Sequence, residues 1–208
     1  MTKKLLTHCL ALALIVAALP ALAYQQFPYD IPGVLTWNPG PPVVPLTVPT
    51  FSDPNLGTVP LKTSVHFGAG DGWATMADGA GIYTFGFSDG SAFPAAEFMM
   101  RSDFKANIPG PSISYYEGQE FYLTLTNVGM KLRPDLFDPH TVHFHGYPNA
   151  ATVFDGEPMA SFGIRMAHDL TYYYNLFDPG TYMYHCHVEA TEHMEMGMLG
   201  NLYIKPRQ

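Results

Sequence analysis

The chain has 208 residues, of which 47% are hydrophobic and only 13% are charged, and acidic residues outnumber basic ones by 18 to 10. An acidic surface repels polyanions, so nucleic acid is excluded as an expected partner. The length fits one domain with an extension. The 19 glycines, 19 prolines and 14% aromatic residues are typical of short strands joined by many turns.

Residues 1–23 are predicted to be an export signal peptide. Two lysines give a basic start, residues 5–19 form an apolar segment, and Ala21–Ala23 has the small side chains of a cleavage site. We expect a periplasmic or secreted protein without a membrane anchor, because no other segment is apolar enough to cross a bilayer. Cleavage removes Cys9 and leaves one cysteine, with eight basic residues against 18 acidic ones, a net charge of about −10.

Residues 24–60 contain nine prolines. Proline removes a backbone donor and favours extended chain outside a strand ladder, so this segment is predicted to be an arm that wraps or extends the domain. The alternative is a disordered linker. We expect residues 61–208 to form the single folded domain.

The folded domain is predicted to consist of strands. A glycine-rich stretch over residues 68–90 contains an expected strand at Ile82–Phe87, and residues 112–127 alternate as two strands joined near Glu117. No segment has sustained helical periodicity with capping residues, although residues 95–101 could form a short helical turn. The fold class is therefore all-β.

A cluster of histidines lies in the segment Asp138–Gly146. Successive side chains of a strand point to opposite faces, so His143 and His145 are expected on one face and His140 on the other. The same alternation applies to the tripeptide His185-Cys186-His187, where the cysteine should point away from both histidines. One face is then expected to carry four imidazoles, those of His143, His145, His185 and His187.

The opposite face is predicted to hold a mononuclear metal site. The loop after the tripeptide can return His193 and Met198 to Cys186, which already has His140 beside it. A thiolate with two imidazoles and a weak thioether is typical of electron-transfer copper. Zinc is the alternative, because it also binds cysteine and histidine.

The remaining histidines and methionines have simpler interpretations. Met194 and Met196 are expected to fill the core, as methionine often does, and only Met198 has a position that favours ligation. His66 and His168 have no partner at motif spacing, so we expect structural or surface roles for them.

Motifs along roughly residues 80 to 205 together resemble the multicopper oxidase family. The matching segments are Ile108–Ile113, Glu117–Gln119, Leu123–Asn127, His143–Gly146, Asp155–Gly156 and Pro179–His187. The resemblance implies a cupredoxin-like fold, an antiparallel Greek-key β-sandwich. It also implies one copper that accepts electrons and a three-copper cluster that reduces dioxygen to water.

The resemblance implies a role for each residue of the two faces. The type 1 copper ligands would be His140, Cys186, His193 and Met198. The type 2 ligand would be His143, and the type 3 ligands would be His145, His185 and His187. Electrons would pass along the Cys-His segment from the first site to the cluster.

Two acids, Asp155 and Glu189, fall where the family places carboxylates that manage protons during dioxygen reduction. The resemblance implies catalytic roles for both. The ordinary alternative is that Asp155 belongs to an Asp-Gly turn and that Glu189 faces solvent.

The chain departs from the family pattern in two ways. Five residues separate His187 from His193, a longer interval than the family usually has, so the geometry of the mononuclear site is expected to differ. The family builds its three-copper cluster from the histidines of two cupredoxin domains, whereas this chain offers the four of one domain. One subunit cannot complete such a cluster.

Two functions follow from this incomplete set. In the first, identical subunits associate so that two histidine faces meet, giving a homo-oligomeric oxidase of the laccase or metal-oxidase class with dioxygen as acceptor. Its donor would be a phenol, Cu(I) or another metal ion, and no motif identifies which. In the second, the chain is a mononuclear electron carrier or a periplasmic copper-handling cupredoxin. The four-histidine face favours the oxidase, because a carrier has no use for it.

Overall fold

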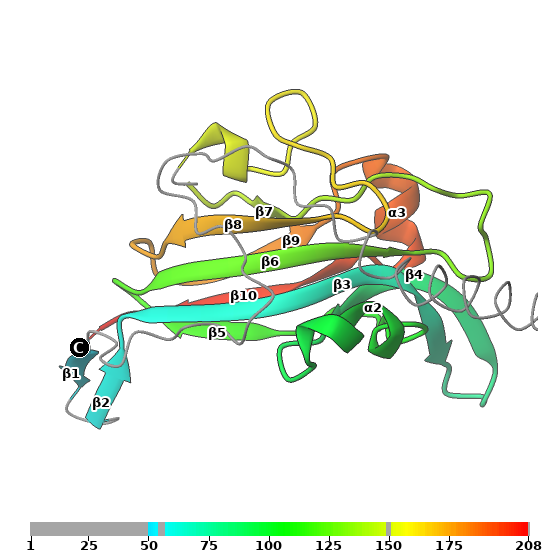
Figure 1. Ribbon diagram of the computed structural model, residues 1–208. Coiled ribbons are helices and arrows are strands. Elements are labelled where there is room, and N and C mark those ends of the chain that lie inside the picture. The colour runs from blue at the N-terminus through cyan, green and yellow to red at the C-terminus, as the bar shows by residue number, and fades with distance from the viewer. Residues whose placement is uncertain (1–49, 54–56, 149–150, 208) are drawn as a thin grey trace, which may run out of the picture. The chain divides into compact units, whose positions relative to one another are not determined.

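Two four-stranded β-sheets make up most of the computed structural model (Figure 1), which describes residues 50–53, 57–148 and 151–207. The described residues belong to the compact unit Leu35–Gln208. The predicted signal peptide and residues 24–49 of the proline-rich segment lie outside the described residues. Within the described ranges, no helix is long and apolar enough to cross a bilayer.

The first sheet has the strand order β4-β3-β6-β8 and the second has the order β5-β10-β9-β7. The first sheet contains β3 (Lys62–Thr75), β4 (Gly81–Asp89), β6 (Glu120–Gly129) and β8 (Asp169–Asn175). The second sheet contains β5 (Ile113–Tyr116), β7 (His143–His145), β9 (Gly180–His185) and β10 (Leu199–Lys205). Helical segments are η1 (Ala95–Glu97), α2 (Phe98–Arg101), η2 (Thr152–Phe154) and α3 (Ala190–Met196).

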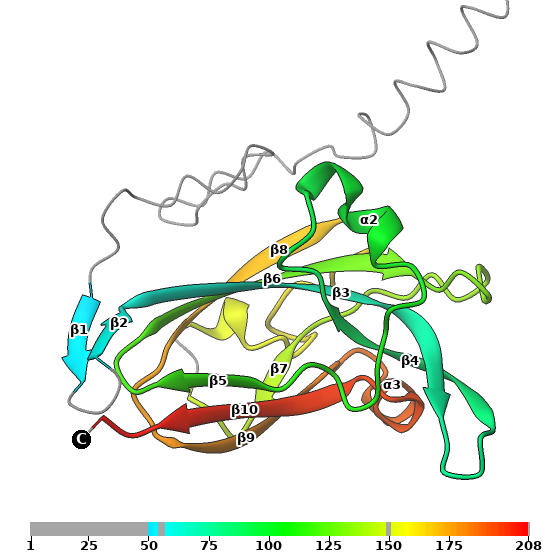
Figure 2. The same cartoon turned by 90° about the horizontal axis from the view of Figure 1, so that it is seen from below.

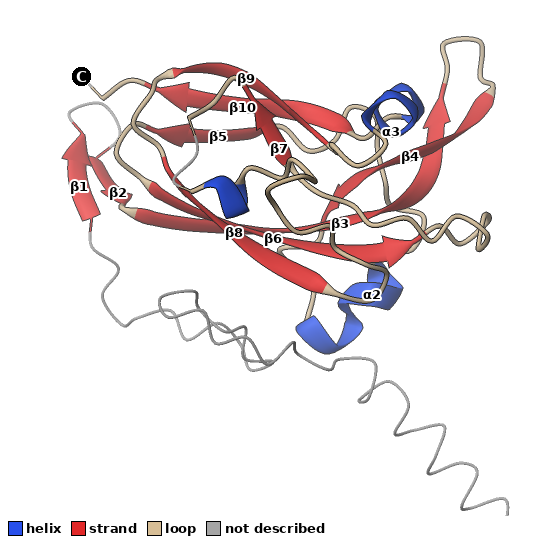
Figure 3. Ribbon diagram, turned by 90° about the horizontal axis from the view of Figure 1, so that it is seen from above, coloured by secondary structure: helices blue, strands red, loops and turns tan. Residues whose placement is uncertain are grey.

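The two sheets form a sandwich, which Figures 2 and 3 show from opposite sides. Most neighbouring strands are antiparallel, but β3 runs parallel to β6 and β5 runs parallel to β10. Parallel neighbours require connections that cross between sheets, as in Greek-key sandwiches. The prediction of an all-β cupredoxin-like sandwich is confirmed.

Aromatic side chains from both sheets fill the core. Phe144 of β7 packs against Phe121 of β6 and Tyr174 of β8, with ring centroids 6.3 and 4.7 Å apart. Phe67 of β3 lies 5.8 Å from the ring of Tyr184 in β9. Burying each such side chain contributes on the order of 1.5–3 kcal/mol, so these contacts fix the separation of the sheets and the position of β7 and β9.

The glycine-rich stretch forms more strand than the sequence predicts. The expected strand at Ile82–Phe87 is part of β4, and the glycines before it lie inside the long strand β3. A side chain at Gly72 would collide with the backbone of Ala106, and a Cβ at Gly86 would lie 2.7 Å from the carbonyl oxygen of Asn107. These glycines therefore admit a chain segment that crosses closely over both strands.

Other local predictions have mixed outcomes. Residues 112–127 form β5 and β6 with the turn near Glu117, and residues 95–101 form η1 and α2, as predicted. The end of the proline-rich segment differs from the prediction, because β1 (Thr50–Asp53) and β2 (Gly57–Pro60) pair as an antiparallel hairpin. Pro60 is the last residue of β2, where a missing backbone donor costs the ladder little.

Candidate metal centre

The thiol of Cys186 lies at the centre of the first candidate site. Cys186 follows the last residue of β9, and its backbone N–H donates to the carbonyl of Met198 at 3.1 Å. Its sulfur lies 3.8 Å from Nδ1 of His140 and 3.3 Å from Nδ1 of His193. All three side chains are buried, so water is excluded from this set of ligand atoms.

Backbone hydrogen bonds hold the partners of Cys186. His140 precedes β7 and exchanges two backbone hydrogen bonds with Ile164, at 3.0 and 2.9 Å. His193 lies in α3, and the N–H of the fully buried Met198 donates to the His193 carbonyl at 2.8 Å. The predicted loop is thus a helix that returns His193 and Met198 to the thiol. Seven residues are too few to show a helical period in the sequence.

Burial keeps this site electrically neutral when no cation is bound. Desolvation, followed by the nearby His193, lowers the pKa of His140 to about 3, and desolvation also lowers the pKa of His193. Desolvation raises the pKa of the Cys186 thiol to about 11. Neutral imidazoles present lone pairs, and a bound cation would convert the thiol to a thiolate. The soft, buried donor set therefore fits copper.

The second candidate site is the four-histidine face. The antiparallel register of β7 and β9 places His143 opposite His185, with ring centroids 5.2 Å apart. The His145 ring lies 5.6 Å from that of His185, and the His187 ring lies 5.0 Å from that of His143. Strand alternation sends these rings away from Cys186, so both predicted faces are present. The role of each residue as a copper ligand stays a prediction.

Backbone carbonyls orient two rings of the four-histidine face. His143 Nδ1 lies 2.7 Å from the carbonyl oxygen of Asp155, and His185 Nδ1 lies 2.9 Å from that of Cys186. An Nδ1–H that donates to a carbonyl leaves Nε2 as the free ligand atom. His185 Nε2 in turn lies 3.3 Å from Nδ1 of His145. One ligand nitrogen each of His143, His145 and His185 lies within 4.8 Å of the others, His145 is exposed, and His187 lies outside this group.

The two predicted acids lie on different sides of the tripeptide. A carboxylate oxygen of Asp155 lies 3.3 Å from His143 Nδ1, beside the four-histidine face. The exposed Glu189 instead groups with Asp138 and the ring of His193, with their potential ligand atoms within 4.8 Å of one another. Sequence reasoning missed Asp138, although an acid two residues before the predicted ligand His140 was a usable signal. Catalytic roles for Asp155 and Glu189 stay predictions.

Thr141 and the remaining histidines complete the surroundings. The Thr141 N–H points at the Cys186 sulfur at 3.5 Å, and its hydroxyl accepts from the His187 N–H at 3.0 Å. His66 stacks on Phe98 and contacts Thr126, and His168 Nδ1 lies 3.0 Å from the Met166 carbonyl oxygen. Neither joins the metal-ligand groups found among the described residues.

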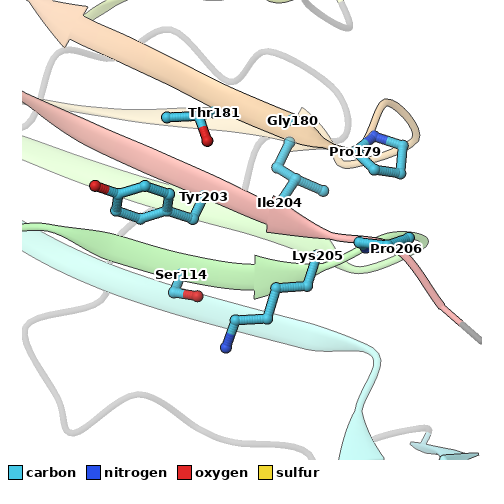
Figure 4. A pocket seen from close by; sticks show the side chains of 8 residues that line it. All are labelled: Ser114, Pro179, Gly180, Thr181, Tyr203, Ile204, Lys205 and Pro206. Atoms are coloured by element: carbon cyan, nitrogen blue, oxygen red, sulfur yellow. The ribbon is translucent and has the colours of Figure 1, made fainter.

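A separate surface hollow lies across β5, β9 and β10 (Figure 4). Its lining residues are Ser114, Pro179, Gly180, Thr181, Tyr203, Ile204, Lys205 and Pro206. It lies near the start of β9, at the other end of that strand from His185, and contains none of the predicted ligands.

Comparison with known proteins identifies the family. The sequence pattern of the family described as multicopper oxidase matches residues 101–208. The multicopper oxidase MmcO of Mycobacterium tuberculosis is 38% identical over 81 residues, which are 39% of this chain and 14% of that protein. The chain thus spans about one seventh of that relative.

Solved structures share the fold. The blue copper oxidase from Nitrosomonas europaea matches with a TM-score of 0.55 and 27% identity over 71% of this chain and 40% of that one. A multicopper oxidase from Pseudomonas thermotolerans matches with a TM-score of 0.53 and 18% identity, covering 71% of this chain and 30% of that one. This second likeness concerns the fold alone.

The sandwich and its buried thiol–imidazole set define a cupredoxin-type copper protein. The chain belongs to the multicopper oxidase family.

Proposed function

We propose that this chain is the subunit of an exported, homo-oligomeric multicopper oxidase that takes electrons from a donor and reduces dioxygen. The observation that carries the proposal is the four-histidine face next to the thiol site within one chain: β7 and β9 supply three of its rings, and His187, two residues after β9, supplies the fourth. A protein that only carried single electrons would have no need of this face.

At the thiol site, His140, Cys186, His193 and Met198 would hold the type 1 copper. Copper bound there supplies one-electron redox chemistry. The protein contributes burial, which excludes water from the ligands, and two imidazoles whose positions are fixed by the backbone pairing with Ile164 and by α3. The N–H of Thr141 directed at the sulfur would tune the potential.

Cys186 would connect the two sites. It is covalently bonded to His185 and His187, and its carbonyl accepts a hydrogen bond from Nδ1 of His185 when that nitrogen is protonated. Electrons leaving the thiolate side would therefore have a short covalent path to the histidine face.

The histidine face would be completed by a second copy of the chain. Four histidines are half of the set that the family uses, and the exposed His145 lies at the edge that a partner could cover. Association of identical subunits gives a symmetric contact that doubles the number of ligands. Beside this face, the Asp155 carboxylate lies 3.3 Å from His143 Nδ1 and would hold a proton there, and Glu189 would serve protons from the thiol side.

Export is proposed from residues 1–23, which carry the features of a signal peptide. The remaining cysteine is consistent with that route, since Cys186 is fully buried among proposed ligands and is protected from oxidation.

The proposal is tested by three measurements on one preparation: copper content, oligomeric state and dioxygen consumption with a phenol and with Cu(I) as donors. We expect more than one copper ion per chain, an oligomer and dioxygen uptake. A monomer with a single copper ion per chain and no dioxygen uptake would instead establish the second candidate, a mononuclear electron carrier or copper-handling protein. The complete thiol site within one chain favours this candidate.

Replacing His143 separates the two sites. His143→Ala should abolish dioxygen reduction and leave the thiolate-to-copper absorption nearly intact, because His143 lies on the face opposite Cys186. His168→Ala is the matched control, since His168 lies outside both ligand groups. Full activity in the His143 variant would contradict the cluster.

A further inference from the structure

The proposed type 1 ligands are inaccessible to a donor. His140 and His193 are each only 1% exposed, and Cys186 and Met198 are not exposed at all. A donor molecule therefore cannot touch a ligand ring, and an electron has to cross protein atoms to reach the thiol site.

A row of aromatic rings connects one of these ligands to the surface. The His193 ring lies 6.0 Å from that of Phe85, the Phe85 ring lies 5.8 Å from that of Tyr83, and the Tyr83 ring lies 5.6 Å from that of Trp73. Each pair meets edge to face. Trp73 ends the row at the surface, with 53% of its area exposed.

The β3–β4 pairing builds this row. Trp73 of β3 is the register partner of Tyr83 in β4, and Phe85 lies two residues further on the same face of β4. The helix α3, which carries His193, contacts β4 and lies beside it in Figures 2 and 3. Strand pairing therefore brings Trp73, Tyr83 and Phe85 to one face, and the packing of α3 against β4 brings His193 to the end of the row.

A buried carboxylate adjoins the row at Tyr83. Asp71 is 1% exposed, and its Oδ2 accepts hydrogen bonds from the Tyr83 hydroxyl at 2.9 Å and from the Leu132 N–H at 3.0 Å. Its other oxygen, Oδ1, is buried and has no hydrogen-bond partner among the described residues. Burying a carboxylate without a cation is costly, and packing alone does not explain it.

We propose that Trp73 and Tyr83 form an electron-uptake relay to His193, with Asp71 as the proton acceptor of Tyr83, and that the donor is an electron-rich aromatic molecule that stacks on Trp73. The relay rests on the proposed copper function. A stacked aromatic donor suits an exposed indole, because offset and edge contacts between rings are favourable.

The relay balances in electrons and protons. When Tyr83 gives an electron towards His193 and the copper(II) ion proposed there, its phenol proton moves to Oδ2 of Asp71. Trp73 then returns an electron to Tyr83, the proton returns to the phenol oxygen, and the donor restores Trp73. The net change is one electron lost by the donor and one gained by the oxidant, and the side chains are unchanged.

Electron transfer between Trp73 and Tyr83 can be measured in the reverse direction, from Tyr83 to oxidised Trp73, without any copper chemistry. Pulse radiolysis with the azide radical oxidises exposed tryptophan by one electron, and the indolyl and phenoxyl radicals have separate absorption bands. The experiment uses the full chain with the substitution Trp37→Phe. This leaves Trp73 as the one tryptophan of the sequence, so that oxidation starts there. We expect the indolyl band to decay as a phenoxyl band grows.

Three variants test whether Tyr83 and Asp71 carry this transfer. Tyr83→Phe should slow it by about tenfold or more, the effect of roughly 1.4 kcal/mol in the barrier. Asp71→Asn should slow it in the same direction, because the amide cannot take the phenol proton. Tyr203→Phe is the matched control, since Tyr203 is also a partly exposed strand tyrosine but belongs to β10, in the other sheet from Trp73. An unchanged rate in Tyr83→Phe would overturn the relay.

A second experiment uses copper-loaded protein that has been reduced under argon. Oxidation of Trp73 should then produce the thiolate-to-copper absorption, and Trp73→Phe and Tyr83→Phe should each slow its appearance by about tenfold. Equal rates in wild type and both variants would overturn the relay. Phenoxyl formation at Tyr83 in a protein that never develops the copper absorption would support the relay and contradict the proposed ligand set. Failure of the relay and failure of the proposed copper function are therefore distinguishable.

Discussion

The sulfur of Cys186 lies beside the rings of His140 and His193, while the neighbouring His185 and His187 extend to the other side of the chain. Among the described residues, Cys186 is the one free cysteine, and its side chain is fully buried. The proposed mononuclear site therefore depends on this residue for its thiolate ligand.

Cys186→Ser should abolish the thiolate-to-copper absorption, because a hydroxyl oxygen is a harder donor that binds copper more weakly than a thiolate does. Serine is close in size to cysteine, so the fold should be retained. Absorption and circular dichroism spectra of the copper-loaded variant check both points, and persistence of the intense band would show that another residue supplies the thiolate-like ligand.

His66 makes the stability of the protein depend on pH. Burial lowers its pKa from 6.5 to about 4, against a smaller opposing effect of Asp89. At pH values above the pKa of His66 in the unfolded chain, His66 is neutral in both the folded and the unfolded protein. As the pH falls below that pKa, the unfolded protein binds a proton at His66 that the folded protein does not bind. Stability is therefore lost between pH values of about 6.5 and about 4, amounting to roughly 2 kcal/mol at a pH of about 5.

His66→Phe should flatten this part of the pH dependence, since phenylalanine can stack on Phe98 but cannot bind a proton. Denaturant unfolding of copper-loaded protein at pH values of about 7 and about 5 measures the difference. His168→Phe serves as the control. If wild type and His66→Phe lose the same free energy of unfolding between these pH values, protonation of His66 is not the cause.

At the scale of elements, the helix α3 sets the geometry of the mononuclear site. It occupies most of the long interval between His187 and Met198 and ends at Met196. Its C-cap is Gly197, whose φ of 122° is rarely adopted by residues with a side chain. A Cβ there would lie 2.7 Å from the carbonyl oxygen of Phe85. The turn that delivers Met198 therefore depends on this glycine.

Gly197→Ala should lower the free energy of unfolding by about 1–3 kcal/mol and shift the copper absorption, because the strained turn displaces Met198. Denaturant unfolding and the absorption spectrum measure these effects. Gly79→Ala is the control: Gly79 also has a positive φ, but a methyl group there would have nothing within 4 Å. Equal effects of both substitutions on the spectrum would contradict a specific role for the α3 turn.

At the scale of the whole molecule, the four-histidine face is exposed at His145, and in the proposed oligomer a second copy of the chain would complete it. Dioxygen uptake per chain should fall on dilution, because separation of subunits divides the proposed cluster. The thiolate absorption per chain should stay constant, because that site lies within one subunit. If dioxygen uptake stays proportional to protein concentration while sedimentation shows only monomers, the proposed cluster at the subunit interface is contradicted.

Much of the site could be predicted because it depends on local alternation. Within His143–His145 and His185–His187, the two-residue period of a strand fixes which side chains share a face. The helix α3 was missed because it is short. The strand β3 was missed because its glycines reflect the close approach of other segments, such as Ala106 at Gly72, rather than a strand propensity. Asp71 gave no signal in the sequence, since its partner Tyr83 is brought to it by strand pairing.

The sequence by itself determined the all-β class, the family and the two faces of the Cys-His segment, because composition, motif spacing and side-chain alternation are properties of neighbouring residues. Only the tertiary structure decided that His143 stands opposite His185, that the proposed type 1 ligands are shut off from solvent, and that a row of rings leads from His193 to Trp73. Register and burial arise from the pairing and packing of segments far apart in the chain, and these long-range contacts are not encoded in any local pattern.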